Sequence, residues 1–517
     1  MTNVHRPTTL GLATLLLAAA CSSRAPDRTL EYYFTADPRS LDPALSTDVP
    51  TGEVIALLFD NLTQFDVDGR LVPGLAHAWT VDPRGVTYTF HLRSGVRFHD
   101  GRTLTARDVA ASFRRALAPA TSGGRGWPLY PIRGAEAFAA GKASDIAGLA
   151  TPDDSTVVLT LERPLNVFPK LLAMPVAAVV PGSIPPGDFG AHPIGSGPWR
   201  FVSWRHDDQI VVAKNPDYWG GAPKADSLRI RIIPEALTQA AEYESGRLSV
   251  VEVPFGETAR WEKDHASELD RRPALRDLYV AINTRRGPLA DVRVRQALNY
   301  ATDVSALLDQ IMGGRGARSA GAIPPGIDGY DPTRAPYPHD VAKAKALLAA
   351  AGYPNGISLQ LWRTNRDEYG RLAQAIQQQL AEAGIKVEIV ERDASTARAA
   401  SMHGDADLFL TDWYADYPDA EDFNYPLFHS SNAGAGGNRA FLADSALDRM
   451  IVRARETPDS AERVRLDRQI DARVFDLAPW IFLWAPVDLW ARQPYVHGWR
   501  VPAIFTGQRW TGAVVAR

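Results

Sequence analysis

The chain has 517 residues and a formal net charge of −4, with 45% hydrophobic and 22% charged residues. These ordinary globular values argue against a disordered chain. The charge is nearly balanced, so the composition gives no sign of a nucleic-acid partner. The length exceeds that of one compact core, and we expect two or three domains.

The N-terminal segment contains Cys21, the only cysteine of the chain. The apolar run 10–20 before it is too short for a bilayer span of about twenty residues but has the length of a signal-peptide core. The segment resembles a bacterial lipoprotein signal, although Ala18 stands where leucine is usual. We expect residues 1–20 to be a signal peptide and Cys21 to be lipidated. The alternative is a discarded secretory leader in which Cys21 has no role.

Further along the chain, strand patterns and helix patterns alternate. Apolar residues at every second position over 86–92 predict a half-buried strand, and Asp100–Gly101 predicts a turn. The segment 105–117 begins with a T-x-x-D cap and continues with apolar residues at helical spacing. A second helix is predicted over 372–380, ended by glycine and followed by a strand over 385–389. These units predict a mixed α/β fold.

One group of sequence phrases points to a known family. In chain order they are "RSLDPALS", "LFDNLTQFDVDGRLVPGLAHAW", "YTFHLRSGVRFHDGRTLTARDVAASFRRAL", "PIGSGPWRF", "NPDYWGGAP", "DVRVRQALNYATD", "AKALLAAAGYPNG" and "DWYADYPDAEDF". Together they resemble the extracytoplasmic solute-binding proteins of peptide-type ABC importers, which include oligopeptide-, dipeptide- and nickel-binding members. The resemblance runs from about Thr29 to near Trp510.

The resemblance implies a periplasmic binding protein-like α/β fold, with two hinged lobes around a buried ligand and an additional domain beside the first lobe. The boundaries that we expect are 1–20 for the signal peptide, 21–58 and 181–275 for lobe 1, 59–180 for the additional domain, 276–485 for lobe 2, and 486–517 for a return to lobe 1. The implied function is a lipid-anchored periplasmic receptor that passes a peptide to an ABC permease. We expect a monomer that uses no cofactor.

The phrase "DVRVRQALNY" has a structural interpretation. Asp291 is predicted to cap a helix whose Val294 and Leu298 face a core. Arg293 and Arg295 are expected to be solvated.

The phrase "DWYADYPDAEDF" carries the candidate site. Asp416 lies among aromatic residues, and a desolvated carboxylate needs a positive partner. In the oligopeptide-binding members, which this W-x-A-D stretch resembles, its aspartate pairs with the ligand ammonium, which implies the same role for Asp416. Trp413, Tyr414 and Ala415 belong to the same stretch, the first two as pocket walls. The alternative is a solvated loop acid, which is how we interpret Asp412, Asp419, Glu421 and Asp422.

The residue that meets a ligand carboxylate is less defined. The segment 401–416 contains no arginine, whereas the oligopeptide binders place arginines there. The dipeptide binders use an arginine in the segment matching "LWRTNRDEYGR", which implies Arg363 or Arg366 here. Arginine suits a carboxylate through a two-pronged contact. Either residue could instead neutralise or cap the start of the next helix. Trp362 is a further candidate wall.

Two rival functions stand beside the peptide receptor. A hydrolase is disfavoured because the chain has no G-x-S-x-G motif, and Ser196 in "IGSGP" lies in a turn phrase. Asp416 with its acidic neighbours could form the carboxylate pair of a glycosidase. A binder of nickel, haem or another small molecule is the second rival. No H-E-x-x-H motif is present, and we expect no metal site.

Overall fold

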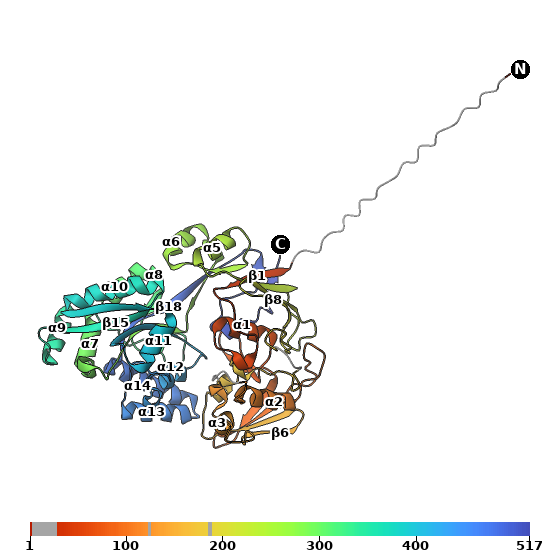
Figure 1. The fold of residues 1–517 in the computed structure, drawn as a ribbon, viewed down its shortest axis with the longest axis horizontal. Coiled ribbons are helices and arrows are strands. Elements are labelled where there is room, and N and C mark those ends of the chain that lie inside the picture. The colour runs from red at the N-terminus through yellow and green to blue at the C-terminus, as the bar shows by residue number, and fades with distance from the viewer. Residues whose placement is uncertain (3–27, 122–125, 185–188, 517) are drawn as a thin grey trace.

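The computed structural model describes residues 1–2, 28–121, 126–184 and 189–516. Cys21 and nearly all of the predicted signal peptide lie outside these residues. Figure 1 shows two bodies of the chain, with the blue C-terminal segment running from one back to the red N-terminal strand of the other. Across the described ranges, no helix is both long enough and apolar enough to cross a membrane.

The first lobe is built on a four-stranded sheet. Its order is β1 (Thr29–Phe34), β10 (Ser227–Ile232), β9 (Gln209–Lys214) and β8 (Trp199–Arg205). The parallel pairing of β1 with β10 joins segments far apart in the sequence. Helix α1 (Val49–Leu58) starts at Asp48, whose side chain accepts a hydrogen bond from the Thr51 amide. The last strands, β19 (Val496–His497) and β20 (Val514–Val515), pack into the same core.

The additional domain contains a second four-stranded sheet. Its order is β4 (Ala76–Val81), β5 (Thr87–Leu92), β7 (Thr156–Thr160) and β6 (Leu149–Asp153). Tyr88, Phe90 and Leu92 are buried, as the alternating pattern predicted. Helix α2 (Ala106–Leu117) begins with a capping box between Thr105 and Asp108, which confirms that predicted helix start.

The second lobe is built on a mixed sheet of eight strands. Its main path is β11 (Val250–Glu252), β18 (Trp480–Arg492), β13 (Arg276–Ile282), β17 (Leu408–Tyr414), β15 (Ile357–Thr364) and β16 (Ile385–Arg392), and β12 (Leu269–Pro273) and β14 (Gly316–Arg318) pair with β18. Strand β18 has 13 residues, and the chain leaves it toward the first lobe. The predicted strand over 385–389 is confirmed within β16.

Helices cover both faces of this sheet. One apolar core contains residues of α7 (Val292–Ala301), α8 (Val304–Met312), α9 (Val341–Ala350) and α10 (Asp367–Glu382). The other contains residues of α11 (Ala394–His403), α12 (Glu421–Phe428), α13 (Ser445–Glu456) and α14 (Ser460–Leu477). The predicted helix over 372–380 is confirmed as part of α10. The candidate residues Trp413 and Tyr414 lie at the end of β17, and Asp416 lies just beyond it.

The remaining elements are short. They are β2 (Thr63–Phe65), β3 (Leu71–Pro73), α3 (Ala135–Ala139), α4 (Phe168–Leu171), α5 (Ala236–Glu244) and α6 (Thr258–Asp264), together with eight 3-10 turns among the described residues: Pro43–Leu45, Trp127–Leu129, Pro175–Ala177, Phe255–Glu257, Ala266–Glu268, Gly287–Ala290, Ser430–Asn432 and Phe505–Gly507.

Helix α7 corrects one prediction. Asp291 caps it as expected by accepting a hydrogen bond from the Arg293 amide, and Arg293 is exposed. The prediction that Arg295 is solvated is wrong, because Arg295 is only 4% exposed. Its guanidinium donates to the carbonyls of Leu289 and Leu477 at 2.7 to 2.9 Å. These bonds satisfy the buried charge and tie α7 to the end of α14.

Candidate functional site

A cleft of about 1560 Å³ separates the additional domain from the second lobe. Pockets for drug-sized ligands measure roughly 300–1,000 Å³, so this cleft has room for a larger ligand with water. The additional domain contributes aromatic and apolar side chains, among them Trp127, Tyr130 and Leu165. The second lobe contributes most of the charged groups.

The end of β17, with Trp413 and Tyr414, and the residue Asp416 beyond it line this cleft. Ala415 is buried, and its amide donates to the Leu275 carbonyl at 2.8 Å, so it fixes the backbone and does not line the cleft. Of the four residues predicted in this stretch, three line the cleft and Ala415 does not.

Asp422 fixes the geometry of this segment. One oxygen of its carboxylate accepts hydrogen bonds from the Asp416 amide at 2.9 Å and from the Trp413 indole at 3.2 Å. Asp422 is 1% exposed, so the interpretation of it as a solvated acid is wrong. Burial, followed by the charge of Asp416, raises the pKa of Asp422 well above its ordinary value. Two neighbouring carboxyl groups therefore lie at this end of the cleft.

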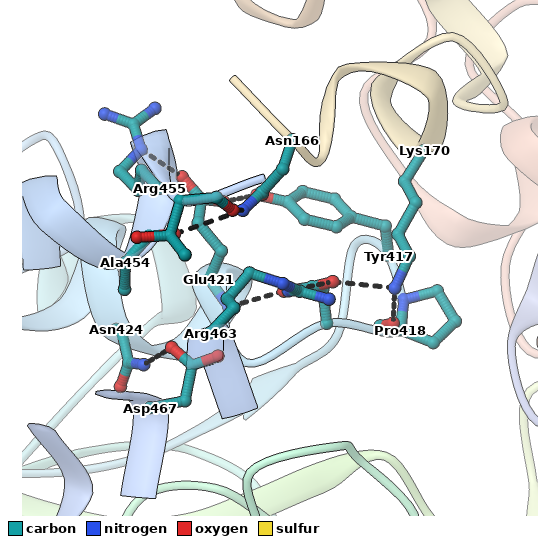
Figure 2. A network of polar contacts seen from close by, with 12 residues as sticks. Asn166, Lys170, Tyr417, Pro418, Glu421, Asn424, Ala454, Arg455, Arg463 and Asp467 are labelled. Carbon is teal, nitrogen blue, oxygen red and sulfur yellow. Dashed lines mark hydrogen bonds and ion pairs between the residues drawn. The ribbon is translucent and has the colours of Figure 1, made fainter. Parts of the chain in front are cut away.

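The interpretation of Asp419 as a solvated loop acid is also wrong. It is 2% exposed and pairs with Lys170 at 2.7 Å and with Arg463 at 2.7 Å. Burial alone would raise the pKa of Asp419, but these two cations outweigh it and hold the pKa below its ordinary value. Figure 2 shows Lys170, from α4, and Arg463, from α14, on different parts of the chain. Asp419 is therefore a buried ion-pair partner.

Glu421 and Asp412 are likewise paired. Glu421 contacts Arg455 at 2.6 Å and accepts a hydrogen bond from the Tyr417 hydroxyl. Asp412 lies 3.7 Å from Arg276 and 3.9 Å from Arg366, with its side chain 25% exposed. Each of the four acids that we expected to be solvated is thus partly or fully buried among polar partners.

The two candidate arginines have different environments. Arg366 lines the cleft, whereas Arg363 pairs with Glu391 on the neighbouring strand and donates to the Thr364 carbonyl at 2.9 Å. Trp362 also lies outside the cleft lining, and its indole donates to Gln360 at 3.3 Å. The structure brings Arg366 together with Trp413, Tyr414 and Asp416, and it leaves Arg363 and Trp362 apart.

Several cleft residues were missed from the sequence. Trp127 and Tyr130 come from a segment nearly 300 positions away from β17 in the chain, and Arg439 follows the glycine-rich stretch 434–437. Only the aromatic phrase "GWPLY" offered a local signal, and nothing in it indicates a cleft. Within the described ranges, no group of three or more metal-binding side chains comes together. Ser196 is fully buried and donates to Asp60 at 2.9 Å, as part of a structural contact.

Comparison with known proteins agrees with this architecture. Residues 70–435 match the family model described as bacterial extracellular solute-binding proteins, family 5 Middle. The glutathione-binding protein GsiB of Escherichia coli O157:H7 is 33% identical, over 92% of this chain and 93% of its own.

Two solved structures have the same fold. The ABC transporter-associated periplasmic binding protein DppA from Helicobacter pylori, in complex with the peptide STSA, has a TM-score of 0.80 and 28% identity, and the match covers 95% of this chain and 98% of that one. Clavulanic acid biosynthesis oligopeptide binding protein 2 has a TM-score of 0.86 and 27% identity, covering 95% and 97%. The predicted fold class is confirmed.

These relatives are binding proteins, so the prediction that the chain is not an enzyme is confirmed and the hydrolase alternative is set aside. The chain belongs to family 5 of the bacterial extracellular solute-binding proteins.

Proposed function

We propose that this chain binds a short peptide in the cleft and delivers it to the permease of an ABC importer from the periplasmic side. The names of its relatives support this proposal, since they bind glutathione or peptides. The size of the cleft, about 1560 Å³, supports a ligand of several residues. An extended peptide could use backbone hydrogen bonds for affinity, while water fills the space around variable side chains.

The observation that carries the proposal is the pair of carboxyl groups at Asp416 and Asp422. Asp416 lines the cleft two residues after Tyr414, and its amide donates a hydrogen bond to the buried Asp422. A negative charge beside a second carboxyl in a partly desolvated site favours a cation. The terminal ammonium of a peptide supplies this cation, and the aromatic walls enclose the first residues.

The experiment is a calorimetric titration with alanine peptides of two to five residues and with glutathione. Asp416→Asn should weaken binding of a peptide with a free amine roughly thirtyfold or more, since losing one partner of a desolvated pair costs about 2–5 kcal/mol. Asp309→Asn removes the same charge from an exposed position of α8, on the opposite face of the sheet, and should change affinity little.

N-acetylation of the same peptide completes the test. It should weaken binding to the wild type but should not further weaken binding to Asp416→Asn, because acetylation and the substitution remove the same contact. Equal losses on acetylation in the two proteins would place the amine elsewhere. A wild type that binds no peptide of the set would reject the peptide function.

We also propose that Cys21 anchors the protein to a bacterial membrane through a lipid. The proposal rests on the short apolar run, the small residues 18–20 and the position of the only thiol. Cys21→Ser should move the protein from the membrane fraction to the soluble periplasmic fraction. A wild type that is already soluble, with its mature N-terminus beyond Cys21, would contradict the anchor.

A further inference from the structure

The segment that carries Asp416 lies between two regular elements. It runs from the end of β17 at Tyr414 to the start of α12 at Glu421. The Asp416 amide donates to the Asp422 carboxylate at 2.9 Å, which fixes the backbone on the N-terminal side of Asp416. A binding side chain is held in its productive direction by the packing of its neighbours. The contacts of the residues that follow Asp416 therefore contribute to where its carboxylate points.

Tyr417, the next residue, is buried in the core of the additional domain. It is 3% exposed and belongs to the apolar cluster of that domain, together with Phe113 of α2 and Phe168 of α4. The centroids of the Tyr417 and Trp127 rings are 6.4 Å apart, and the ring planes meet at 42°. A residue of the second lobe thus completes the core of the additional domain.

The hydroxyl group of Tyr417 is held by the second lobe. It donates a hydrogen bond to the carboxylate of Glu421, as Figure 2 shows. Glu421 is 6% exposed and pairs with Arg455 at 2.6 Å, so this acceptor is itself fixed. The ring of Tyr417 is therefore held by apolar packing, and its hydroxyl by a buried ion pair.

The two residues after Tyr417 also contact the additional domain. The Pro418 carbonyl accepts a hydrogen bond from Nζ of Lys170 in α4 at 2.7 Å, and the same ammonium pairs with Asp419 at 2.7 Å. The Pro418 ring lies against Gly69 in the turn between β2 and β3, where an added Cβ would be 3.2 Å from the proline Cγ. The additional domain thus holds three consecutive residues of the second lobe.

We infer that Tyr417 is a positioning residue for the amine site: the additional domain binds its ring and thereby aims the carboxylate of Asp416 at the ligand amine. One planar peptide joins the two residues, with Cα atoms about 3.8 Å apart, so a displacement of Tyr417 also moves Asp416. The additional domain takes part in amine recognition without contacting the amine. This inference rests on the proposed function and gives the additional domain a role in it.

Tyr417 also borders the cleft, so the test separates positioning from direct contact with the ligand. Calorimetry compares the tightest-binding alanine peptide with its N-acetyl form on the wild type, Tyr417→Leu and Phe113→Leu. Phe113 is 0% exposed in the same core, so its replacement leaves a similar cavity outside the segment 417–419. Tyr417→Leu should reduce the preference for the free amine roughly tenfold or more, by weakening binding of the free peptide alone. Phe113→Leu should keep the wild-type preference.

Two further variants of Tyr417 sharpen the test. Tyr417→Phe keeps the ring packing and loses only the hydroxyl, so it should retain most of the preference. Tyr417→Met fills the same space with a flexible chain, so it should lose the preference and serves if Tyr417→Leu does not fold.

Three results would overturn the inference even if Asp416→Asn removes the preference. They are an unchanged preference in Tyr417→Leu and Tyr417→Met, an equal loss of preference in Phe113→Leu, and equal weakening of the free and acetylated peptides in Tyr417→Leu. The last result would indicate a direct contact with the ligand. If the wild type shows no preference, or binds no alanine peptide, the amine role of Asp416 fails, and this inference fails with it.

Discussion

Asp277 shows how a single buried carboxyl group links the fold to pH. One of its oxygens accepts a hydrogen bond from the Ser319 hydroxyl at 2.7 Å, and the other is buried without a partner. The pKa of Asp277 is raised to about 8, mainly by burial. The hydrogen bond from Ser319 lowers this pKa, and the charge of Asp471 raises it. An unfolded aspartate has a pKa of about 3.9. The folded protein therefore holds a proton that the unfolded chain releases at neutral pH.

The consequence is a loss of stability as pH rises. The contribution of Asp277 is fully present below about pH 4 and is lost as pH rises through about 8, at up to about 1.4 kcal/mol per pH unit. Asp277→Asn cannot ionise, so it should lose less stability than the wild type between pH 5 and pH 9 in urea unfolding. Asp309→Asn, changed at an exposed site, should follow the wild type. Parallel profiles for Asp277→Asn and the wild type would contradict this account.

At the residue scale, sequence patterns predicted which residues line the cleft better than they predicted which acidic side chains are buried. The W-x-A-D stretch led to Asp416, Trp413 and Tyr414, which the structure places at the cleft. Asp419 looked like one more loop acid, because its partners Lys170 and Arg463 are 249 and 44 positions away. The burial of Asp419 depends on residues that are distant in the sequence, so no local sequence pattern predicts it.

At the element scale, the segment 166–170 joins the additional domain to the second lobe. The Asn166 side chain donates to the carbonyls of Ala454 and Thr457 at 3.1 and 2.8 Å, near the end of α13. Lys170, in α4, donates to the Pro418 carbonyl at 2.7 Å and pairs with Asp419. Figure 2 shows Asn166 reaching Ala454 and Lys170 reaching Pro418. We call the two residues Asn166 and Lys170 the latch.

The latch should hold the cleft closed. Lys170→Met leaves Asp419 paired with Arg463 but removes the ion pair between the two bodies. We expect faster dissociation of bound peptide, measured by stopped-flow fluorescence, and a larger radius of gyration in small-angle scattering. Asn166→Ala should add to both changes because it removes two further hydrogen bonds.

Lys142→Met is the matched control, since Lys142 is exposed in the additional domain. It should leave the dissociation rate and the radius of gyration unchanged. A Lys170→Met protein that matches this control in both measurements would show that the latch does not govern closure.

Elements with a strong local pattern were predictable. The helix α10 and the strand β16 follow from apolar spacing with a glycine between them, and α2 follows from its cap. Helix α12 was not predicted: it begins within the acidic phrase "DAEDF" and contains Pro426. Its Phe423 and Phe428 are fully buried against the second lobe. Tertiary packing therefore decides this helix, and the acids at its start belong to its buried polar network.

At the scale of the whole molecule, the cleft exists only because distant segments meet. The additional domain supplies Trp127 and Tyr130, and the second lobe supplies Asp416 and Arg439. The family phrases predicted the architecture, because their order along the chain covers nearly the whole of it. They did not predict Arg439, which lines the cleft and follows the loop 433–438 between α12 and α13. The match over residues 70–435 likewise shows the family and not the ligand contacts.

The central claim is that one peptide binds in the cleft with its amine at Asp416. Native mass spectrometry of the wild type, mixed with the alanine peptides and glutathione, tests it most directly. The account predicts one peptide per chain for the wild type and for Asp309→Asn, and loss of this complex in Asp416→Asn at the same concentrations. No complex with the wild type, or one that Asp416→Asn retains equally, would contradict it.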